Sequence, residues 1–194
     1  LIIPFPNQNI SDEDHIIFGK KFGELEIHPS LSHRSSKNSQ IYRVSNVDEE
    51  GKIIPDKQTS WQYLKQSWLW HTDSSFRKIP SNGSILHGIN TTKKGGNTLF
   101  ANMYRAYENL SDGLKGTLES MNACHSSRHV FGAHTGYAEA SNQRIGNPEL
   151  ATQDAIHPVI ITHPESKRKA LYVNPEFTVN FEGWTKEESK PLLN

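Results

Sequence analysis

The sequence has little cysteine, no excess of charge of either sign and no long apolar run. Its one cysteine, Cys124, cannot form a disulfide within the chain, so a disulfide framework is excluded and a reducing compartment, the cytoplasm, is expected. We interpret Cys124 as a small buried side chain rather than a nucleophile. Lys and Arg together number 21, as do Asp and Glu, and the resulting zero net charge argues against a nucleic-acid partner, whose binding surface needs a basic excess.

Membrane and targeting segments are also missing from the 194 residues. No apolar run approaches the ~20 residues that a transmembrane helix needs, so no membrane partner is predicted, and no signal peptide is visible. The chain opens on the strand-like run Leu1–Phe5 without an initiator Met, and an apolar pattern begins before Asn194 without closing. We therefore expect further residues on both sides. The length suffices for one domain with a substantial core.

Short apolar or alternating runs are spread along the chain and predict a mainly β fold. Strands are expected over 1–5, 41–45, 66–71, 83–89, 98–101, 159–162 and 170–173. Helices are expected from Ser11 to about Gly23, over 104–120, and after Thr185. This pattern predicts one α+β domain over 1–194, a jelly roll (double-stranded β-helix) with flanking helices that is incomplete at its C-terminal end.

Residues 126–153 form the longest stretch without regular periodicity. They are polar and contain glycine, and long irregular segments inside a domain are usually functional lids or disordered segments. We interpret 126–153 as a mobile lid or insert.

The triplet His71-Thr72-Asp73 places an imidazole and a carboxylate two residues apart. On a strand, side chains at this spacing share a face, so both could reach one ion. Two His and one carboxylate on one face of an octahedral ion form the ligand set of non-haem Fe(II) oxygenases. A bare His-X-Asp triplet more often marks an exposed polar pair. Here Trp70 and Phe76 flank the triplet and place it at the rim of an apolar region, where a metal–carboxylate interaction is strengthened.

A second motif, Gly95-Gly96-Asn97-Thr98, reads as a turn into a strand. On this pattern alone a hairpin is the simplest interpretation. The hydroxyl of Thr98 at the start of the strand could also donate to a carboxylate ligand of the metal site.

Five segments, in order along the chain, resemble those of the TauD/TfdA family of Fe(II)/2-oxoglutarate dioxygenases. The segments are Phe22–Pro29, Trp70–Asp73 with Gly95–Phe100, Met103–Glu108, His157–Pro164 and Leu171–Asn174. The resemblance implies that His71 and Asp73 are two of three iron ligands and that Thr98 hydrogen-bonds a carboxylate of 2-oxoglutarate. Each motif is weak by itself, and their common order carries the resemblance.

The resemblance also implies the rest of the site. His28, Phe131 and Tyr172 match positions that line the substrate pocket of taurine-type members, although core packing explains Phe131 and Tyr172 equally well. Fe(II) would be the cofactor, with 2-oxoglutarate and O2 as co-substrates. A small anionic molecule of aryloxyalkanoate, sulfonate or sulfate ester type would be hydroxylated, with release of succinate and CO2. A homo-oligomer is compatible with the family.

The sequence departs from the family in three places. Leu31 and Ser67 stand where taurine-type members have Tyr and Asn, which puts taurine in doubt, and 69–76 looks closer to aryloxyalkanoate-type members. The second metal His, and the Arg that pairs with 2-oxoglutarate, are expected beyond Asn194. We do not favour any histidine within the chain as the third ligand, in particular His125, His129, His134, His157 and His163.

Two other classes of function stay open from the residues. One is a jelly-roll module that binds a metal or ligand without turnover. The other is a zinc hydrolase that uses the same His-X-Asp pair. Catalytic zinc sites are four-coordinate with a bound water, and no separate general base is evident beside this pair.

Overall fold

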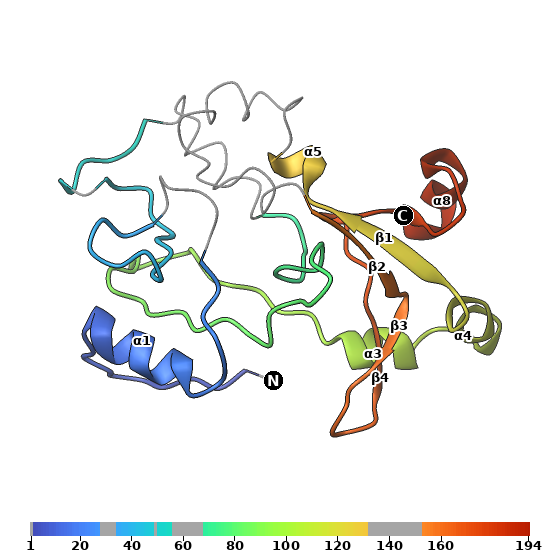
Figure 1. Cartoon of the computed structure of the whole chain (residues 1–194), viewed down its shortest axis with the longest axis horizontal. Helices are drawn as coiled ribbons and strands as arrows, with labels where there is room; N and C mark the ends of the chain where they lie inside the picture. Colours follow the sequence, from blue (N-terminus) through green and yellow to red (C-terminus); the bar gives the residue numbers. More distant parts are fainter. Residues whose placement is uncertain (1, 28–33, 49, 56–67, 132–152) are drawn as a thin grey trace.

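The computed structural model describes residues 2–27, 34–48, 50–55, 68–131 and 153–194, and for Val130 and Phe131 the backbone alone. Figure 1 shows helix α1 and long extended segments on one side of the molecule. Two small antiparallel sheets with their helices lie on the other side. The segment that carries His71 and Asp73 runs between these two parts.

Helix α1 (Asp12–Lys20) begins where the sequence predicts it. The side chain of Ser11 accepts a hydrogen bond from the backbone of Asp14, whose carboxylate accepts one from the backbone of Ser11. This reciprocal capping box satisfies two backbone donors that the first helical turn leaves free. The helix ends at Lys20, just before Gly23, whose φ of 141° suits glycine.

The helix predicted over 104–120 is two helices, α3 (Met103–Glu108) and α4 (Asp112–Leu118). Ser111 starts the second helix, because its side chain accepts from the backbone of Leu114. The apolar positions keep helical spacing across this break, so periodicity alone predicts one continuous helix. Helix α3 packs against strand β4.

Strand β1 (Asn122–Ser126) is the centre of the larger sheet, whose order is β2-β1-β5. It pairs antiparallel with β2 (Asp154–Pro158) and with β5 (Thr178–Phe181), and its register with β5 shifts between Cys124 and His125. The short helix α5 (Arg128–Phe131) follows β1.

The second sheet is a hairpin of β3 (Ile160–Thr162) and β4 (Lys169–Leu171). Strand β3 lies within the predicted strand 159–162, and β4 overlaps the predicted strand 170–173 but begins one residue earlier and ends at Leu171. Lys167 with a φ of 57° turns the chain between them. Helix α8 (Lys186–Leu193) closes the described chain and packs against β5, and a capping box of Thr185 and Glu188 begins it as the sequence predicts.

The core lies between helix α4 and the two sheets, with β1 and β5 from the larger sheet and β3 from the hairpin. Its buried members are Leu118, Ala123, Val159, Ile160 and Phe181, and Tyr107, Leu110, Met121, Leu171, Val173 and Leu193 pack against them. Because β1 and β5 run through this core, side chains on them have fixed positions.

Several predicted strands have no ladder among the described residues. The segments 68–71, 83–89 and 98–101 are described without strand pairing, as is 2–5, and 41–45 forms an isolated bridge between Tyr42 and Arg34. An extended segment becomes a strand by pairing its backbone with a neighbour, and alternation in the sequence does not supply that neighbour. Antiparallel sheets with flanking helices are therefore confirmed, while the jelly roll, incomplete at its C-terminal end, stays a prediction. The segment predicted as a lid lies mostly outside the described residues, which omit 132–152.

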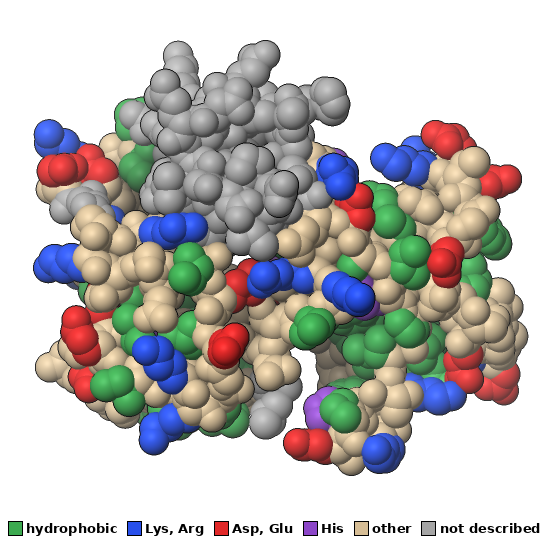
Figure 2. All heavy atoms as spheres, in the orientation of Figure 1, with side chains coloured by type: hydrophobic (Ala, Val, Ile, Leu, Met, Phe, Trp, Pro, Cys, Tyr) green, Lys and Arg blue, Asp and Glu red, His purple; other side chains and the backbone are tan. Residues whose placement is uncertain are grey.

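No helix in the described part of the chain combines the length and apolar character needed to cross a membrane. On the face drawn in Figure 2, basic and acidic side chains are interspersed, as the zero net charge leads one to expect.

Candidate metal centre

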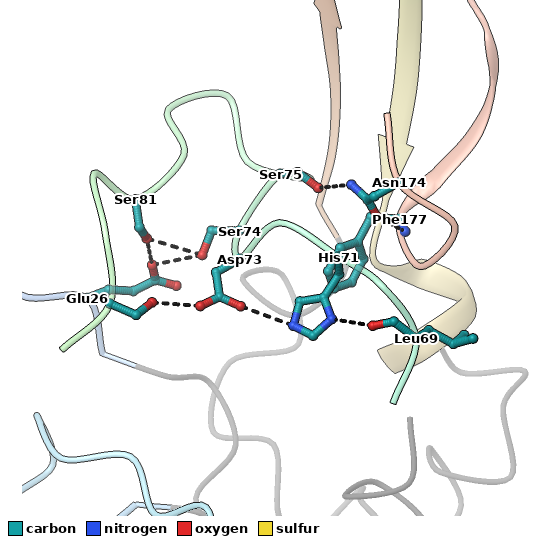
Figure 3. A network of polar contacts seen from close by, with 10 residues as sticks. Glu26, Leu69, His71, Asp73, Ser74, Ser75, Ser81, Asn174 and Phe177 are labelled. Atoms are coloured by element: carbon teal, nitrogen blue, oxygen red, sulfur yellow. Dashed lines mark hydrogen bonds and ion pairs between the residues drawn. The ribbon is translucent and has the colours of Figure 1, made fainter. Parts of the chain in front are cut away.

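His71 and Asp73 converge in the structure. Nε2 of His71 lies 3.2 Å from Oδ1 of Asp73, and the two side chains are 28% and 60% exposed (Figure 3). They reach this geometry from a turn rather than from the predicted strand, since 73–76 is a hydrogen-bonded turn with Ser75 N–H donating to Thr72 O. The prediction that both side chains could reach one ion therefore fits the geometry, and the predicted strand is wrong for this segment.

The orientation of the His71 ring is fixed on its other side. Nδ1 donates to the carbonyl oxygen of Leu69 at 2.7 Å, because a carbonyl can only accept. Nε2 is therefore the nitrogen that faces Asp73. The hydrogen bond with Asp73, opposed in part by burial, raises the pKa of His71 above its usual value. A backbone carbonyl holding the second ring nitrogen is the usual arrangement behind a metal-binding histidine.

The carboxylate of Asp73 has a hydrogen-bond donor of its own. The hydroxyl of Ser84 donates to Oδ2 at 2.6 Å, while Oδ1 is the oxygen that faces His71. One oxygen is thus engaged with the protein and the other points toward the imidazole. This division favours coordination of an ion through Oδ1.

Phe177 supplies the apolar side of the site. Its ring packs edge-on against His71 at 6.0 Å between centroids and against Phe76 at 4.9 Å. Trp70, by contrast, is half exposed. The expected apolar rim is therefore built partly from Phe76 and partly from Phe177, which lies far along the chain.

Two sets of contacts hold the turn that carries Asp73. The first comes from Glu26, whose Oε2 accepts from the hydroxyls of Ser74 at 3.0 Å and Ser81 at 2.5 Å. Its Oε1 pairs with the guanidinium of Arg77 at 2.8 Å. All three donors lie in the segment 74–81, which directly follows Asp73.

The second set comes from the larger sheet. The buried hydroxyl of Ser75 accepts from the side-chain amide of Asn174 at 3.3 Å and lies 3.2 Å from Nδ1 of His125 on β1. Nε2 of His157 on β2 donates to the carbonyl oxygen of Arg77 at 2.9 Å. The turn is thereby fixed to β1 and β2 of the larger sheet and to the connection that precedes β5.

His125 is fully buried and neutral at ordinary pH. Burial, with the nearby charge of His157 as a smaller cause, lowers its pKa to about 4. Its ring lies 5.5 Å from those of His157 and Tyr172, and its Nε2 has no hydrogen-bond partner among the described residues. His125 therefore belongs to the support of the turn.

The other predicted site residues are not brought to the pair. Thr98 lies exposed after Gly95 and Gly96, whose φ values of 78° and 70° fit the predicted turn. Tyr172 packs against His125 and His157. Among the described residues, no hydrogen bond or ring contact joins Thr98 or Tyr172 to the pair.

Two predicted pocket residues cannot be placed relative to His71 and Asp73. His28 lies outside the described residues, as does the side chain of Phe131. Within the described part of the chain, no third His, Cys, Asp or Glu completes a metal-binding group. The assignment of these residues and of the third ligand stays a prediction.

The donor set fits the ion that the family resemblance implies. One imidazole nitrogen and one carboxylate oxygen, each oriented by a second hydrogen bond, are ligands suited to a divalent transition ion such as Fe(II). Sequence reasoning missed two residues around the pair, Ser84, which donates to Asp73, and Glu26, which binds Ser74, Ser81 and Arg77. Only tertiary contacts reveal these two, although Glu26 stands inside the matching segment 22–29.

Comparison with known proteins gives a family and named relatives for this chain. Residues 2–194 match the family model for "Taurine catabolism dioxygenase TauD, TfdA family". The chain is 31% identical over 199 residues to the alpha-ketoglutarate-dependent sulfonate dioxygenase of Saccharomyces cerevisiae, covering all of this chain and 45% of that protein. It is 30% identical over 200 residues to the alpha-ketoglutarate-dependent 2,4-dichlorophenoxyacetate dioxygenase of Burkholderia sp., covering 99% of this chain and 64% of that one. The chain thus spans less than two thirds of either relative.

The solved structures that resemble this chain also include a dioxygenase. The crystal structure of AAD-2 in complex with Mn(II) and N-oxalylglycine is similar with a TM-score of 0.72 and 27% identity, over 97% of this chain and 64% of that one. A taurine dioxygenase from Burkholderia xenovorans is similar with a TM-score of 0.67 and 26% identity, over 96% of this chain and 54% of that one. Because the family model matches nearly the whole chain, the protein belongs to the TauD/TfdA family of dioxygenases.

Proposed function

We propose that the protein is an Fe(II)- and 2-oxoglutarate-dependent dioxygenase that hydroxylates a small anionic organic molecule, with His71 and Asp73 as two of its metal ligands. The observation that carries the proposal is the convergence of Nε2 of His71 and Oδ1 of Asp73 at 3.2 Å. Family membership supports the metal and the co-substrate, and the AAD-2 structure contains Mn(II) and an oxalyl ligand.

The residues of this chain have separate tasks in the proposed reaction. When bound, Fe(II) supplies the activation of O2 that couples decarboxylation of 2-oxoglutarate to succinate and CO2 with hydroxylation of the substrate. His71 presents Nε2 because the carbonyl of Leu69 holds its Nδ1–H. Asp73 presents Oδ1 because Ser84 engages Oδ2.

Two aromatic side chains restrict access of water on one side of the pair. Phe177 and Phe76 pack together, and Phe177 also covers an edge of the His71 ring. Excluding water there protects the reaction from side reactions with solvent.

The remaining parts of the site are proposals by resemblance. Thr98 is assigned to a carboxylate of 2-oxoglutarate, and His28, Phe131 and Tyr172 are assigned to the substrate pocket. The third metal ligand, a histidine, and the Arg that pairs with 2-oxoglutarate are assigned to residues beyond Asn194. We also propose that these parts complete a jelly roll, and that the protein works in the cytoplasm, with which its single cysteine agrees.

The substrate is proposed as a class. Relatives are named for sulfonates, for 2,4-dichlorophenoxyacetate and for (S)-phenoxypropionate, all of which carry an anionic group on a small organic skeleton. A sulfonate, sulfate ester or aryloxyalkanoate fits this class.

Succinate release by the full-length protein tests the proposal. With Fe(II), 2-oxoglutarate and O2, at least one member of a panel of sulfonates, sulfate esters and aryloxyalkanoates should stimulate succinate formation well above the rate without substrate. Both His71→Ala and Asp73→Ala should abolish that stimulation. His87→Ala is the matched control, since the ring of His87 packs against His15 and takes no part in the site.

Either of two results would count against the proposal. One is an enzyme that binds no iron and forms no succinate with any substrate of the panel. The other is unchanged turnover in His71→Ala.

A further inference from the structure

Glu26 stands out among the acidic residues of the described chain because both of its carboxylate oxygens are bound by side chains of one short segment, 74–81. Oε2 accepts from Ser74 and Ser81, and Oε1 pairs with Arg77. The Glu26 side chain is 31% exposed and that of Arg77 is 27% exposed. Figure 3 shows the Glu26 carboxylate beside Ser74 and Ser81, on the far side of Asp73 from His71.

Ser74, which lies between Glu26 and the pair of His71 and Asp73, has an unusual backbone conformation. Ser74, which directly follows Asp73, has a φ of 58°. This left-handed conformation is unfavourable for residues other than glycine, because Cβ comes close to the carbonyl oxygen. Ser74 therefore needs a contact that holds it in this conformation. Its hydroxyl donates to Oε2 of Glu26 at 3.0 Å.

The conformation of Ser74 decides where the Asp73 carboxylate points. A change of φ at Ser74 would rotate the chain on one side of it relative to the other and so move Asp73 relative to Ser75. Ser75 is fixed by Asn174 and by His125 on β1. Glu26 acts from the opposite side, so the turn is held between two supports. A partly exposed ion pair alone contributes little to stability, but a carboxylate that binds three side chains of one short segment, 74–81, restricts that segment.

We propose that Glu26 is a positioning residue for the metal site, which holds Ser74 in its left-handed conformation and thereby aims Asp73 at the ion. The proposal rests on the function proposed above, because it requires Asp73 to be a ligand. Glu26 itself does not touch the ion, the co-substrate or the substrate. Its effect should therefore appear in metal affinity.

Mn(II) titration of the full-length protein, followed by electron paramagnetic resonance of the free ion, measures that affinity. Glu26→Ala should weaken Mn(II) binding about tenfold, the lower end of the effect expected when a group that orients a ligand is lost. Glu24→Ala, an exposed carboxylate two residues earlier, is the matched control and should bind like the wild type. The melting temperature without metal is recorded for each variant, and Glu26→Gln replaces Glu26→Ala if the latter does not fold.

A second substitution separates positioning from a general structural role. Glycine adopts a φ of 58° without strain, so Ser74→Gly removes the need for the anchor. Introduced into the Glu26 variant, it should restore most of the lost affinity, whereas a variant weakened by loss of packing would not recover.

Each outcome has one meaning. Weakened binding with recovery by Ser74→Gly supports the proposal. Unchanged binding in the Glu26 variant, or weakening without recovery, overturns it while leaving the metal site in place. If the wild type does not bind Mn(II), or His71→Ala binds as tightly, the proposed function itself fails, and this result is distinguishable from the other two.

Discussion

Asp73 needs a defined orientation before it can share an ion with His71, and individual side chains provide it. Ser84 donates to Oδ2 at 2.6 Å, which leaves Oδ1 beside the imidazole. The hydroxyl acts on the proposed ligand Asp73 rather than on the fold, because Ser84 is exposed and its loss creates no buried cavity.

Ser84→Ala should therefore lower metal affinity about tenfold with little change in stability. Calorimetric titration of Mn(II) and a thermal melt of the metal-free protein check both parts. Asn82→Ala, at an exposed position two residues earlier, is the control and should leave the affinity unchanged. A melting temperature that falls with the affinity would argue that Ser84 supports the fold instead.

His125 makes stability depend on pH in a direction opposite to that of a histidine with an acidic partner. Its pKa falls from an ordinary 6.5 to about 4 on folding, chiefly through burial. Between these values the unfolded chain binds a proton on His125 and the native chain does not. The free energy of unfolding should therefore decrease as the pH falls from 6.5 towards 4, by roughly 3 kcal/mol in total from this group.

Urea denaturation at several pH values measures this loss. His125→Asn, which keeps a polar group near Ser75, should flatten the dependence in this window. His87→Asn should retain it. An equally steep dependence in His125→Asn would show that other groups are responsible.

The two proposed metal ligands could be chosen from the sequence, while the contacts that surround them could not. His71 and Asp73 stand two residues apart in a recognisable motif, so a local pattern suffices to find them. Glu26 and Ser84 act through contacts between residues 48 and 11 positions apart along the chain, and no local pattern marks such pairs.

At the scale of elements, β1 shows where sequence patterns fail. Its sequence, Asn-Ala-Cys-His-Ser, has no β-branched or aromatic residue and does not suggest a strand. It becomes one because β2 and β5 pair with both of its edges. Capped helices such as α1 and α8 were predictable, since their start signals lie within four consecutive residues.

Helix α8 is joined to β5 by a buried hydroxyl. Ser189 is fully buried, and its Oγ accepts from the backbone N–H of Phe181 at 3.0 Å while donating to the carbonyl oxygen of Thr185. Phe181 is itself a buried core residue. The contact therefore connects the last described helix to the sheet that holds the turn carrying Asp73.

Ser189→Ala should lower the free energy of unfolding by about 1–3 kcal/mol, because it leaves the Phe181 N–H without its acceptor. Urea denaturation measures the change. Ser120→Ala, at an exposed helix end, should cost less than about 0.5 kcal/mol. Equal effects of the two substitutions would mean that the buried hydrogen bond contributes nothing specific.

At the scale of the whole molecule, the candidate site depends on contacts between segments that lie far apart in the sequence. The segment after α1 supplies Glu26, the segment 69–77 supplies His71 and Asp73, and β1, β2 and the β4–β5 connection supply the contacts that hold this segment. The order of motifs was sufficient to predict the family, which the match over residues 2–194 confirms. The packing of these parts follows from tertiary contacts, and the sequence alone did not reveal it.

Binding of an ion by such an assembled site should stabilise the whole protein. At a free Mn(II) concentration a hundredfold above the dissociation constant, the native state gains about 2.7 kcal/mol. The melting temperature of the full-length protein should therefore rise with Mn(II), and more so with 2-oxoglutarate present. His71→Ala should show no such rise, whereas a rise equal to that of the wild type would place the ion elsewhere.

The most direct measurement of the central claim is the visible absorption of the full-length protein with Fe(II) and 2-oxoglutarate under anaerobic conditions. We predict the weak charge-transfer band of a 2-oxoglutarate chelate on iron, present in the wild type and absent in both His71→Ala and Asp73→Ala. A wild type without the band, or variants that retain it, would contradict the assignment of His71 and Asp73 as ligands of a 2-oxoglutarate-dependent iron site.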